Sequence, residues 1–152
     1  MKLLRPILLG GLVAGTLDIL YAFIHYGLAF GVSPVHICQS VAAGWIGRPA
    51  AFAGGLPVAA LGLASHYLIA TLFAAFFVLC ATRIPAIVMR PFITGPVYGG
   101  GLYFVMNYAV VPLSNAGAKG PPEGWILVGA IFTHTVLVGL PIALIAKRNL
   151  AK

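Results

Sequence analysis

The sequence predicts an all-α membrane protein, and three observations lead to this fold class. The 152-residue chain is 61% hydrophobic and only 7% charged, whereas soluble domains carry roughly 25% charged residues. Its apolar residues fall into four long runs, each close to the roughly 20 residues that a transmembrane helix needs. The alternating pattern of barrel strands is absent. Because lipid offers no hydrogen-bond partners to an open backbone, the four runs are predicted to be helices.

The four apolar runs are expected to be transmembrane spans of one domain, residues 1–152. Proline stands at or near the start of three of them, where its missing N–H costs little. Ser33 and Pro34 combine an N-cap with a proline at the first helical position, which predicts a further short helix over about residues 34–46. Trp45 suits the headgroup level, so this helix is expected at the interface, in the first outer loop. The predicted spans are about residues 6–30, 57–80, 91–113 and 125–146.

The positions of Lys and Arg predict the orientation, because cytoplasmic loops carry an excess of both. With the N-terminus inside, seven of the nine cationic residues face the cytoplasm: Lys2, Arg5, Arg83, Arg90, Lys147, Arg148 and Lys152. Only Arg48 and Lys119 face outward. We therefore expect a multi-pass protein of the bacterial inner membrane with both termini in the cytoplasm. Nucleic acid is not an expected partner, since the net charge of +7 is scattered and forms no basic face.

Asp18 is the most informative residue, because it lies within an apolar run. The other acidic residue, Glu123, lies in a polar loop. A carboxylate at bilayer depth costs about 2.5–3.5 kcal/mol on insertion scales and marks a candidate functional site. The run around Asp18 is long and lacks a convincing signal-peptide cleavage site, so it is expected to stay as the first span. Cys38 and Cys80 are expected at opposite sides of the membrane, too far apart to pair.

Several polar residues of the other spans are expected at a similar depth. At a rise of 1.5 Å per residue, Asp18 lies about 18 Å below the outer surface and His25 about 8 Å below it. His66 and His134 each lie nine residues into their spans, which places both about 13 Å deep. We therefore predict a buried polar cluster in the outer half of the membrane. Its members are Asp18, His25, His66, Tyr103, Asn107 and His134.

Three functions are open for this cluster. In the first, Asp18 pairs with His66 or His134 in a non-enzymatic accessory, assembly or stress-related protein, and the pair responds to pH. In the second, Asp18 and the histidines carry ions or protons in a transporter or channel subunit. In the third, His66 and His134 ligate haem b, or hold a divalent metal ion together with Asp18. No cofactor and no catalytic residue is predicted, since paired carboxylates, a GxSxG sequence and a phosphate-binding loop are absent.

Glycines spaced one helical turn apart predict close helix contacts. Gly11 and Gly15 lie in the first span, and Gly95 and Gly99 lie in the third. Such spacing lets two helix backbones approach each other. We expect these glycines to pack helices within the bundle or along a homodimer seam. Lipid is the expected surrounding, with a homodimer or a larger membrane complex as the expected assembly.

Several segments resemble the YagU-like family of uncharacterised bacterial inner-membrane proteins. The resemblance implies a multi-pass membrane protein with a link to acid stress, and it implies no mechanism. Family members are longer between the first spans and carry acidic residues where this chain has Ile131–Thr133. The segments that carry the resemblance are Gly11–Gly15, Gly62–His66, Phe73–Phe77, Ile84-Pro85, Val111–Leu113 and His134.

Overall fold

The chain folds into helices that cross one another at different slants. The computed structural model describes residues 3–117, 120 and 122–150, and within that part of the chain it contains no strand. Two π-helical segments, η1 (Met106–Val110) and η2 (Thr133–Gly139), interrupt the later helices. The α-helices are α1 (Leu4–Phe30), α2 (Pro34–Ile46), α3 (Arg48–Ala53), α4 (Gly55–Arg83), α5 (Ala86–Met89), α6 (Pro91–Val105), α7 (Val111–Leu113), α8 (Gly124–Phe132) and α9 (Leu140–Leu150).

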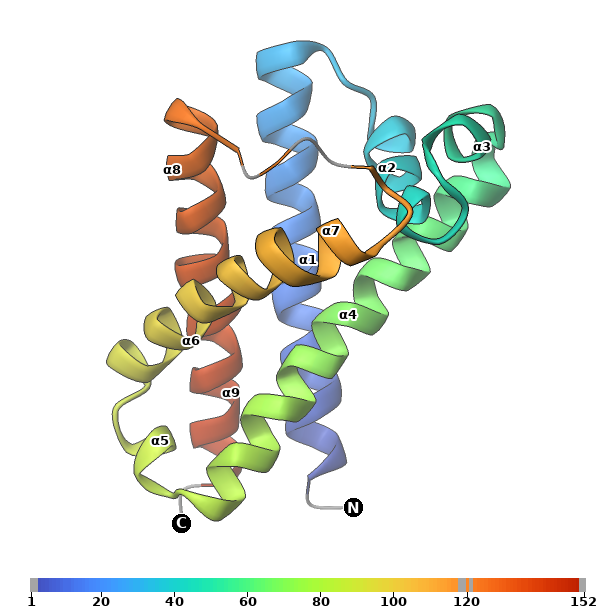
Figure 1. Ribbon diagram of the computed structural model, residues 1–152. Coiled ribbons are helices and arrows are strands. Elements are labelled where there is room, and N and C mark those ends of the chain that lie inside the picture. Colours follow the sequence, from blue (N-terminus) through green and yellow to red (C-terminus); the bar gives the residue numbers. More distant parts are fainter. Residues whose placement is uncertain (1–2, 118–119, 121, 151–152) are drawn as a thin grey trace.

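Three helical rods are long and apolar enough to cross a membrane. They are α1, α4 and the continuous rod α8–η2–α9, which runs from Gly124 to Leu150. In Figure 1, α1 and the α8–η2–α9 rod stand side by side, and α4 runs past them at a slant. The first residues of α1 and the last residues of α9 lie at the same end of the molecule. Three of the four predicted spans therefore correspond to helices with the required length and composition.

The fourth predicted span, residues 91–113, is helical over its whole length but is not among these three rods. It consists of α6, η1 and α7, and it crosses the α8–η2–α9 rod obliquely (Figure 1). It contains the run Gly99–Gly101 and the polar residue Asn107. That this segment crosses a membrane stays a prediction.

The predicted short helix is present as α2, over the same residues. Ser33 caps it, because its hydroxyl oxygen accepts the backbone N–H of His36 at 3.2 Å. The helix packs closely on α4: a Cβ placed on Gly62 would collide with the Cys38 carbonyl. Trp45, expected at the headgroup level, donates its indole N–H to the Ser65 hydroxyl of α4 at 2.9 Å. The position of α2 relative to a membrane stays a prediction, and α3 was not predicted.

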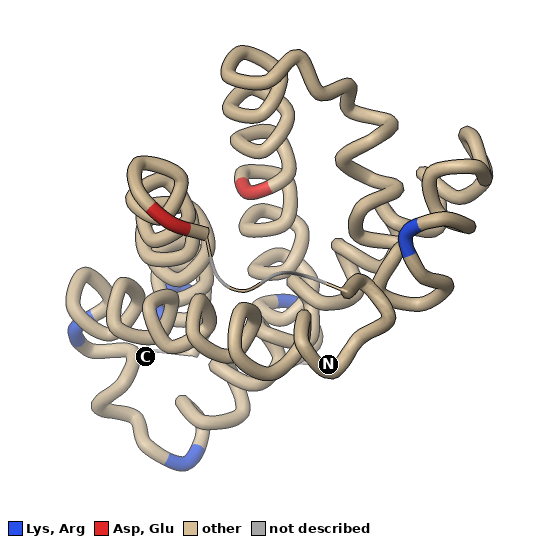
Figure 2. The backbone as a smooth tube through the Cα atoms, turned by 45° about the horizontal axis from the view of Figure 1, so that its top comes forward, with Lys and Arg blue, Asp and Glu red and all other residues tan. Residues whose placement is uncertain are grey.

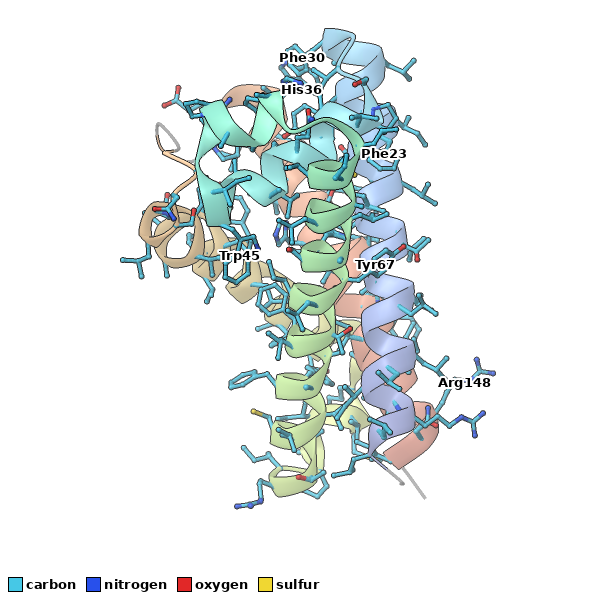
Figure 3. All side chains as sticks on the ribbon, turned by 90° about the vertical axis from the view of Figure 1, so that its right-hand side faces the viewer. Phe23, Phe30, His36, Trp45, Tyr67 and Arg148 are labelled. Atoms are coloured by element: carbon cyan, nitrogen blue, oxygen red, sulfur yellow. The ribbon has the colours of Figure 1, made fainter. Side chains whose placement is uncertain are left out.

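The charged residues and the apolar core occupy different parts of the molecule. Figure 2 shows Lys and Arg near helix ends and in connecting segments, and one acidic position part-way along α1. Figure 3 places Arg148 at the opposite end of the molecule from Phe30 and His36. The charges of Lys2, Lys119 and Lys152, used above to predict orientation, lie outside the described residues. The core joins α1, α4, α5, α6, η2 and α9; its larger members are Phe77, Val78, Leu102, Val138 and Ile142.

Candidate functional site

Asp18 on α1 faces His66 on α4. The Asp18 Oδ2 and His66 Nε2 atoms are 3.9 Å apart, and the side chains of His66 and Asp18 are 12% and 30% exposed. The same Nε2 atom lies 2.8 Å from the carbonyl oxygen of Gly15. A carbonyl oxygen only accepts, so His66 donates its Nε2–H to Gly15. The separation from Asp18 is too long for a hydrogen bond, and the pair is an ion pair when the imidazole is protonated.

Asp18 and His66 line a pocket of about 260 Å³, here called the central pocket. The other polar groups in its wall are Asn107 of η1 and His134 of η2; the remaining lining is apolar and includes Val41 of α2. Ligand pockets span roughly 300–1,000 Å³. The central pocket can therefore hold a small ligand or a few water molecules, and its polar side chains can bind protons.

His134 is held in one orientation by its neighbours. Its Nδ1 atom lies 2.9 Å from the Ala130 carbonyl oxygen, so Nδ1 donates there. A neutral imidazole with its proton on Nδ1 has an acceptor at Nε2. The ring meets Tyr103 edge-on, with centroids 5.7 Å apart. Asn107 donates its side-chain amide to the Tyr103 carbonyl at 2.9 Å.

A second pocket of about 100 Å³, here called the His25 pocket, adjoins the central pocket. Asp18 and His134 line both, so these two side chains form the shared wall. Tyr21 and His25 line only the smaller one, and the Tyr21 Oη and His25 Nδ1 atoms are 3.1 Å apart. The His25 ring lies 4.8 Å from Trp125, in the first turn of α8. Asp18, Ala22 and His25 of α1 all line the His25 pocket and so share one face of the helix.

The expectation of one buried Asp/His cluster is wrong. Among the described residues, Asp18 and all the predicted histidines are half-buried, and they are divided between two pockets. Tyr103 is the buried member of the predicted set, and it lines neither pocket. His66 reaches Asp18 from α4, whereas His25 packs against Trp125 of α8, so the two histidines meet different neighbours of α1.

The geometry does not favour a metal or haem site. Within residues 3–117, 120 and 122–150, no group of three His, Cys, Asp or Glu side chains is placed to hold a metal ion. Asp18, His66 and His134 are therefore not assembled as ligands. Ligation of haem by His66 through Nε2 would also break the hydrogen bond to Gly15.

Gly11 and Gly15 lie where α1 meets α4. A Cβ placed on Gly11 would come within 2.5 Å of the Thr71 Cα atom. One placed on Gly15 would come within 2.9 Å of the Tyr67 ring. Figure 3 shows Tyr67 beside α1, and the Tyr67 hydroxyl lies 3.0 Å from that of Thr16. These glycines hold α4 close enough for His66 to reach the Gly15 carbonyl.

Gly95 and Gly99 lie where α6 meets the α8–η2–α9 rod. A Cβ placed on Gly95 would come within 2.8 Å of the Leu140 Cα atom. One placed on Gly99 would collide with the His134 carbonyl and come within 2.8 Å of the Thr135 Cα atom. Both pairs of predicted glycines thus contact helices of the same chain. Gly99 in particular fixes the backbone that carries His134.

Two features of the site were missed at the level of sequence. Tyr21 lies three residues after Asp18 and four before His25, a helical spacing that would have placed it on their face. The π-helical segments η1 and η2, which carry Asn107 and His134, were also missed. π-Helical turns are rare and frequently occur at functional sites.

No protein-family model, curated protein or solved structure matches this chain. The interpretation of the site therefore depends on its geometry.

Proposed function

We propose that this is a small accessory or stress-related protein of the bacterial inner membrane that takes up protons at Asp18 from the outer side. The observation that carries the proposal is the wall of Asp18 and His134 shared by the two pockets. Histidine titrates near neutral pH, and an intramembrane carboxylate marks a site of proton or ion binding. The resemblance to the YagU-like family, with its link to acid stress, agrees with this role.

The route to Asp18 begins at the end of α1 that lies beside the start of α8. His25 there contacts Trp125 and lies within hydrogen-bonding distance of Tyr21. Tyr21 and His25 line the same small pocket as Asp18. Hydroxyl and imidazole groups both accept and donate protons. The titratable groups around Asp18 are then Tyr21, His25 and Tyr26 on its own helix, His66 on α4 and His134 on η2.

The opposite half of the molecule favours a protein that responds to protons and does not conduct them as an open channel. Beyond the central pocket, Phe77, Val78 and Ile142 are almost fully buried in the apolar core. A core packed to that degree has few voids larger than a water molecule. Protons that reach Asp18 from the His25 side would therefore change the charge of the site without passing through.

We further propose four membrane crossings, with both termini in the cytoplasm and α2 at the outer interface. The shared end of α1 and α9 and the Lys and Arg residues there support this orientation. A chain without its two native cysteines should react with a membrane-impermeant maleimide from outside when Ser33→Cys is introduced. With Met89→Cys it should react only after the membrane is opened. The reverse pattern would contradict the orientation.

Infrared difference spectroscopy on the reconstituted protein tests proton uptake. Acidification from about pH 8 to about pH 5 should produce the carbonyl-stretch band of a protonated carboxyl. Asp18→Asn should lose this band. Glu123→Gln is the matched control, because it removes the other carboxylate side chain of the chain, which is exposed, and it should keep the band. A band that survives Asp18→Asn and disappears in Glu123→Gln would refute the proposal.

A transporter or channel subunit is the second candidate, because the polar wall and the central pocket would also serve transport. Proteoliposomes with a pH-sensitive dye inside distinguish the two functions. After external acidification, we expect the internal pH to fall no faster than it does in empty liposomes. Sustained proton flux that Asp18→Asn abolishes would favour the transporter.

A further inference from the structure

Two apolar grooves lie side by side between α4 and α6, and the second shares Phe73 with the central pocket. One has a volume of about 410 Å³ and the other about 460 Å³. Phe76 and Tyr98 line both grooves and separate them. The first also contacts Cys80, Ile93 and Val97, and the second contacts Leu72, Gly101 and Val105.

The wall between the grooves is fixed, and the grooves offer no free polar group. The Tyr98 hydroxyl donates to the Phe73 carbonyl at 2.8 Å, and its ring packs edge-on against Phe77 at 5.0 Å. Thr94, a polar residue of the first groove, donates its hydroxyl to the Ile87 carbonyl at 2.7 Å. With these groups satisfied, the grooves suit hydrocarbon.

An arginine stands at the end of each helix that forms the grooves: Arg83 is the last residue of α4, and Arg90 is the N-cap of α6. On α4, Arg83 follows Phe76 by seven residues and Cys80 by three. Before α6, Arg90 precedes Ile93 by three residues and Val97 by seven. Residues three, four and seven apart share one helix face, which aligns Arg83 with Phe76 and Cys80; Arg90 directly precedes the first turn of α6. Both arginines therefore stand at the end of the grooves nearest to α5.

These arginines are free to bind an anion. Both are exposed. Among the described residues, the one ion pair within 4.0 Å joins His66 to Asp18, so no carboxylate neutralises either arginine. Guanidinium groups bind phosphate in a bidentate manner. An apolar double groove with a cationic end is complementary to a lipid that has two acyl chains and an anionic head group.

We propose that the grooves hold the two acyl chains of an anionic phospholipid of the phosphatidylglycerol class, with its phosphate on Arg83 and Arg90. Tyr98 separates the chains. The anionic surface of the cytoplasmic leaflet, where these arginines are predicted to lie, supplies such lipids. The site is independent of Asp18 and of the proton uptake proposed above.

Electron spin resonance of spin-labelled lipids in nanodiscs measures the preference directly. Labelled phosphatidylglycerol should show a motionally restricted fraction that equally labelled phosphatidylcholine does not. Arg83→Gln and Arg90→Gln should each lower the relative affinity about fivefold, the effect of one cation at an anionic membrane surface. Arg148→Gln, which removes an exposed arginine from α9, is the matched control and should change it less than twofold.

Filling a groove tests the acyl-chain sites separately from the charge. A Cβ on Gly101 would meet no atom within 4 Å, so Gly101→Leu fits the fold while it occupies the second groove. It should abolish the restricted phosphatidylglycerol fraction. Ala60→Leu, at an exposed position of α4 outside both grooves, should leave the fraction unchanged.

Three outcomes of the lipid measurements would overturn the proposal. These are equal restriction of both lipids, an unchanged fraction in Gly101→Leu, and loss of the fraction in Arg148→Gln to the same degree as in Arg83→Gln. Chemical crosslinking should also find no second copy of the chain at the grooves. A homodimer that Gly101→Leu dissociates would mean that a second copy of the chain, not lipid, occupies the grooves.

Discussion

The contact of Gly99 with η2 gives the sharpest test of the helix packing. In the variant Gly99→Ala, the new methyl group meets the His134 carbonyl and the Thr135 Cα atom. Both are backbone atoms and cannot rotate away. The α6 helix must therefore move outward from the turn that carries His134.

The size of the effect follows from two opposing contributions. Forcing a methyl group into a packed interface costs typically 1–3 kcal/mol, and rigid backbone neighbours place Gly99→Ala near the upper end of that range. Alanine returns about 1 kcal/mol of helix propensity relative to glycine. We expect the free energy of unfolding to fall by about 2 kcal/mol. Gly101→Ala, whose methyl group meets no atom within 4 Å, should instead raise it by up to about 1 kcal/mol.

Equilibrium unfolding in mixed micelles, followed by circular dichroism as the fraction of denaturing detergent rises, measures both variants. The two substitutions are chemically identical and lie two residues apart on one helix. A Gly99→Ala protein as stable as Gly101→Ala would refute the close contact between α6 and η2, and with it the placement of His134.

Three further predictions concern other contacts. A double-mutant cycle between Tyr67→Phe and Thr16→Val should give a coupling free energy of about 0.6 kcal/mol, typical of hydrogen bonds between membrane helices, because the two hydroxyls lie 3.0 Å apart; additive effects in mixed-micelle unfolding would contradict the contact. In a Cys80→Ser protein, Cys38 should react slowly with maleimide at neutral pH, since burial raises the pKa of the Cys38 thiol and lowers its thiolate fraction. Its rate should rise with pH and on unfolding in detergent, and equal rates in the native and unfolded protein would argue against its burial. Gly62→Ala should lower the free energy of unfolding by about 1–3 kcal/mol, because its methyl group would collide with the Cys38 carbonyl; unchanged stability would place α2 farther from α4.

Local signals in the sequence predicted most helices and their limits. The Ser33-Pro34 pair predicted the start of α2 because the cap is a contact between near neighbours in the chain. The long apolar runs predicted α1 and α4, within a few residues at each end. Apolar length depends on composition alone, so these helices needed no tertiary information.

The buried cluster could not be predicted in this way, because side chains at the same depth in the membrane can lie on different sides of their helices. His66 and His134 were expected at one depth, and both do line the central pocket with Asp18. His25 was expected in the same cluster, but it lies in the His25 pocket, against Trp125. The slant of each helix decides which side chains meet, and slant is set by contacts such as that of Gly11 with Thr71. Sequence spacing within one helix does not contain this information.

The π-helical segments link the sequence to the site through two prolines. Pro112 and Pro141 each follow the end of a π-helical segment by two residues. Proline lacks an N–H and its ring clashes with the carbonyl four residues earlier, and a wider helical turn relieves that clash. Pro96, which lies inside α6, has no π-helical segment before it. The prolines of the later helices thus widen the turns that carry Asn107 and His134, and both side chains line the central pocket as a result.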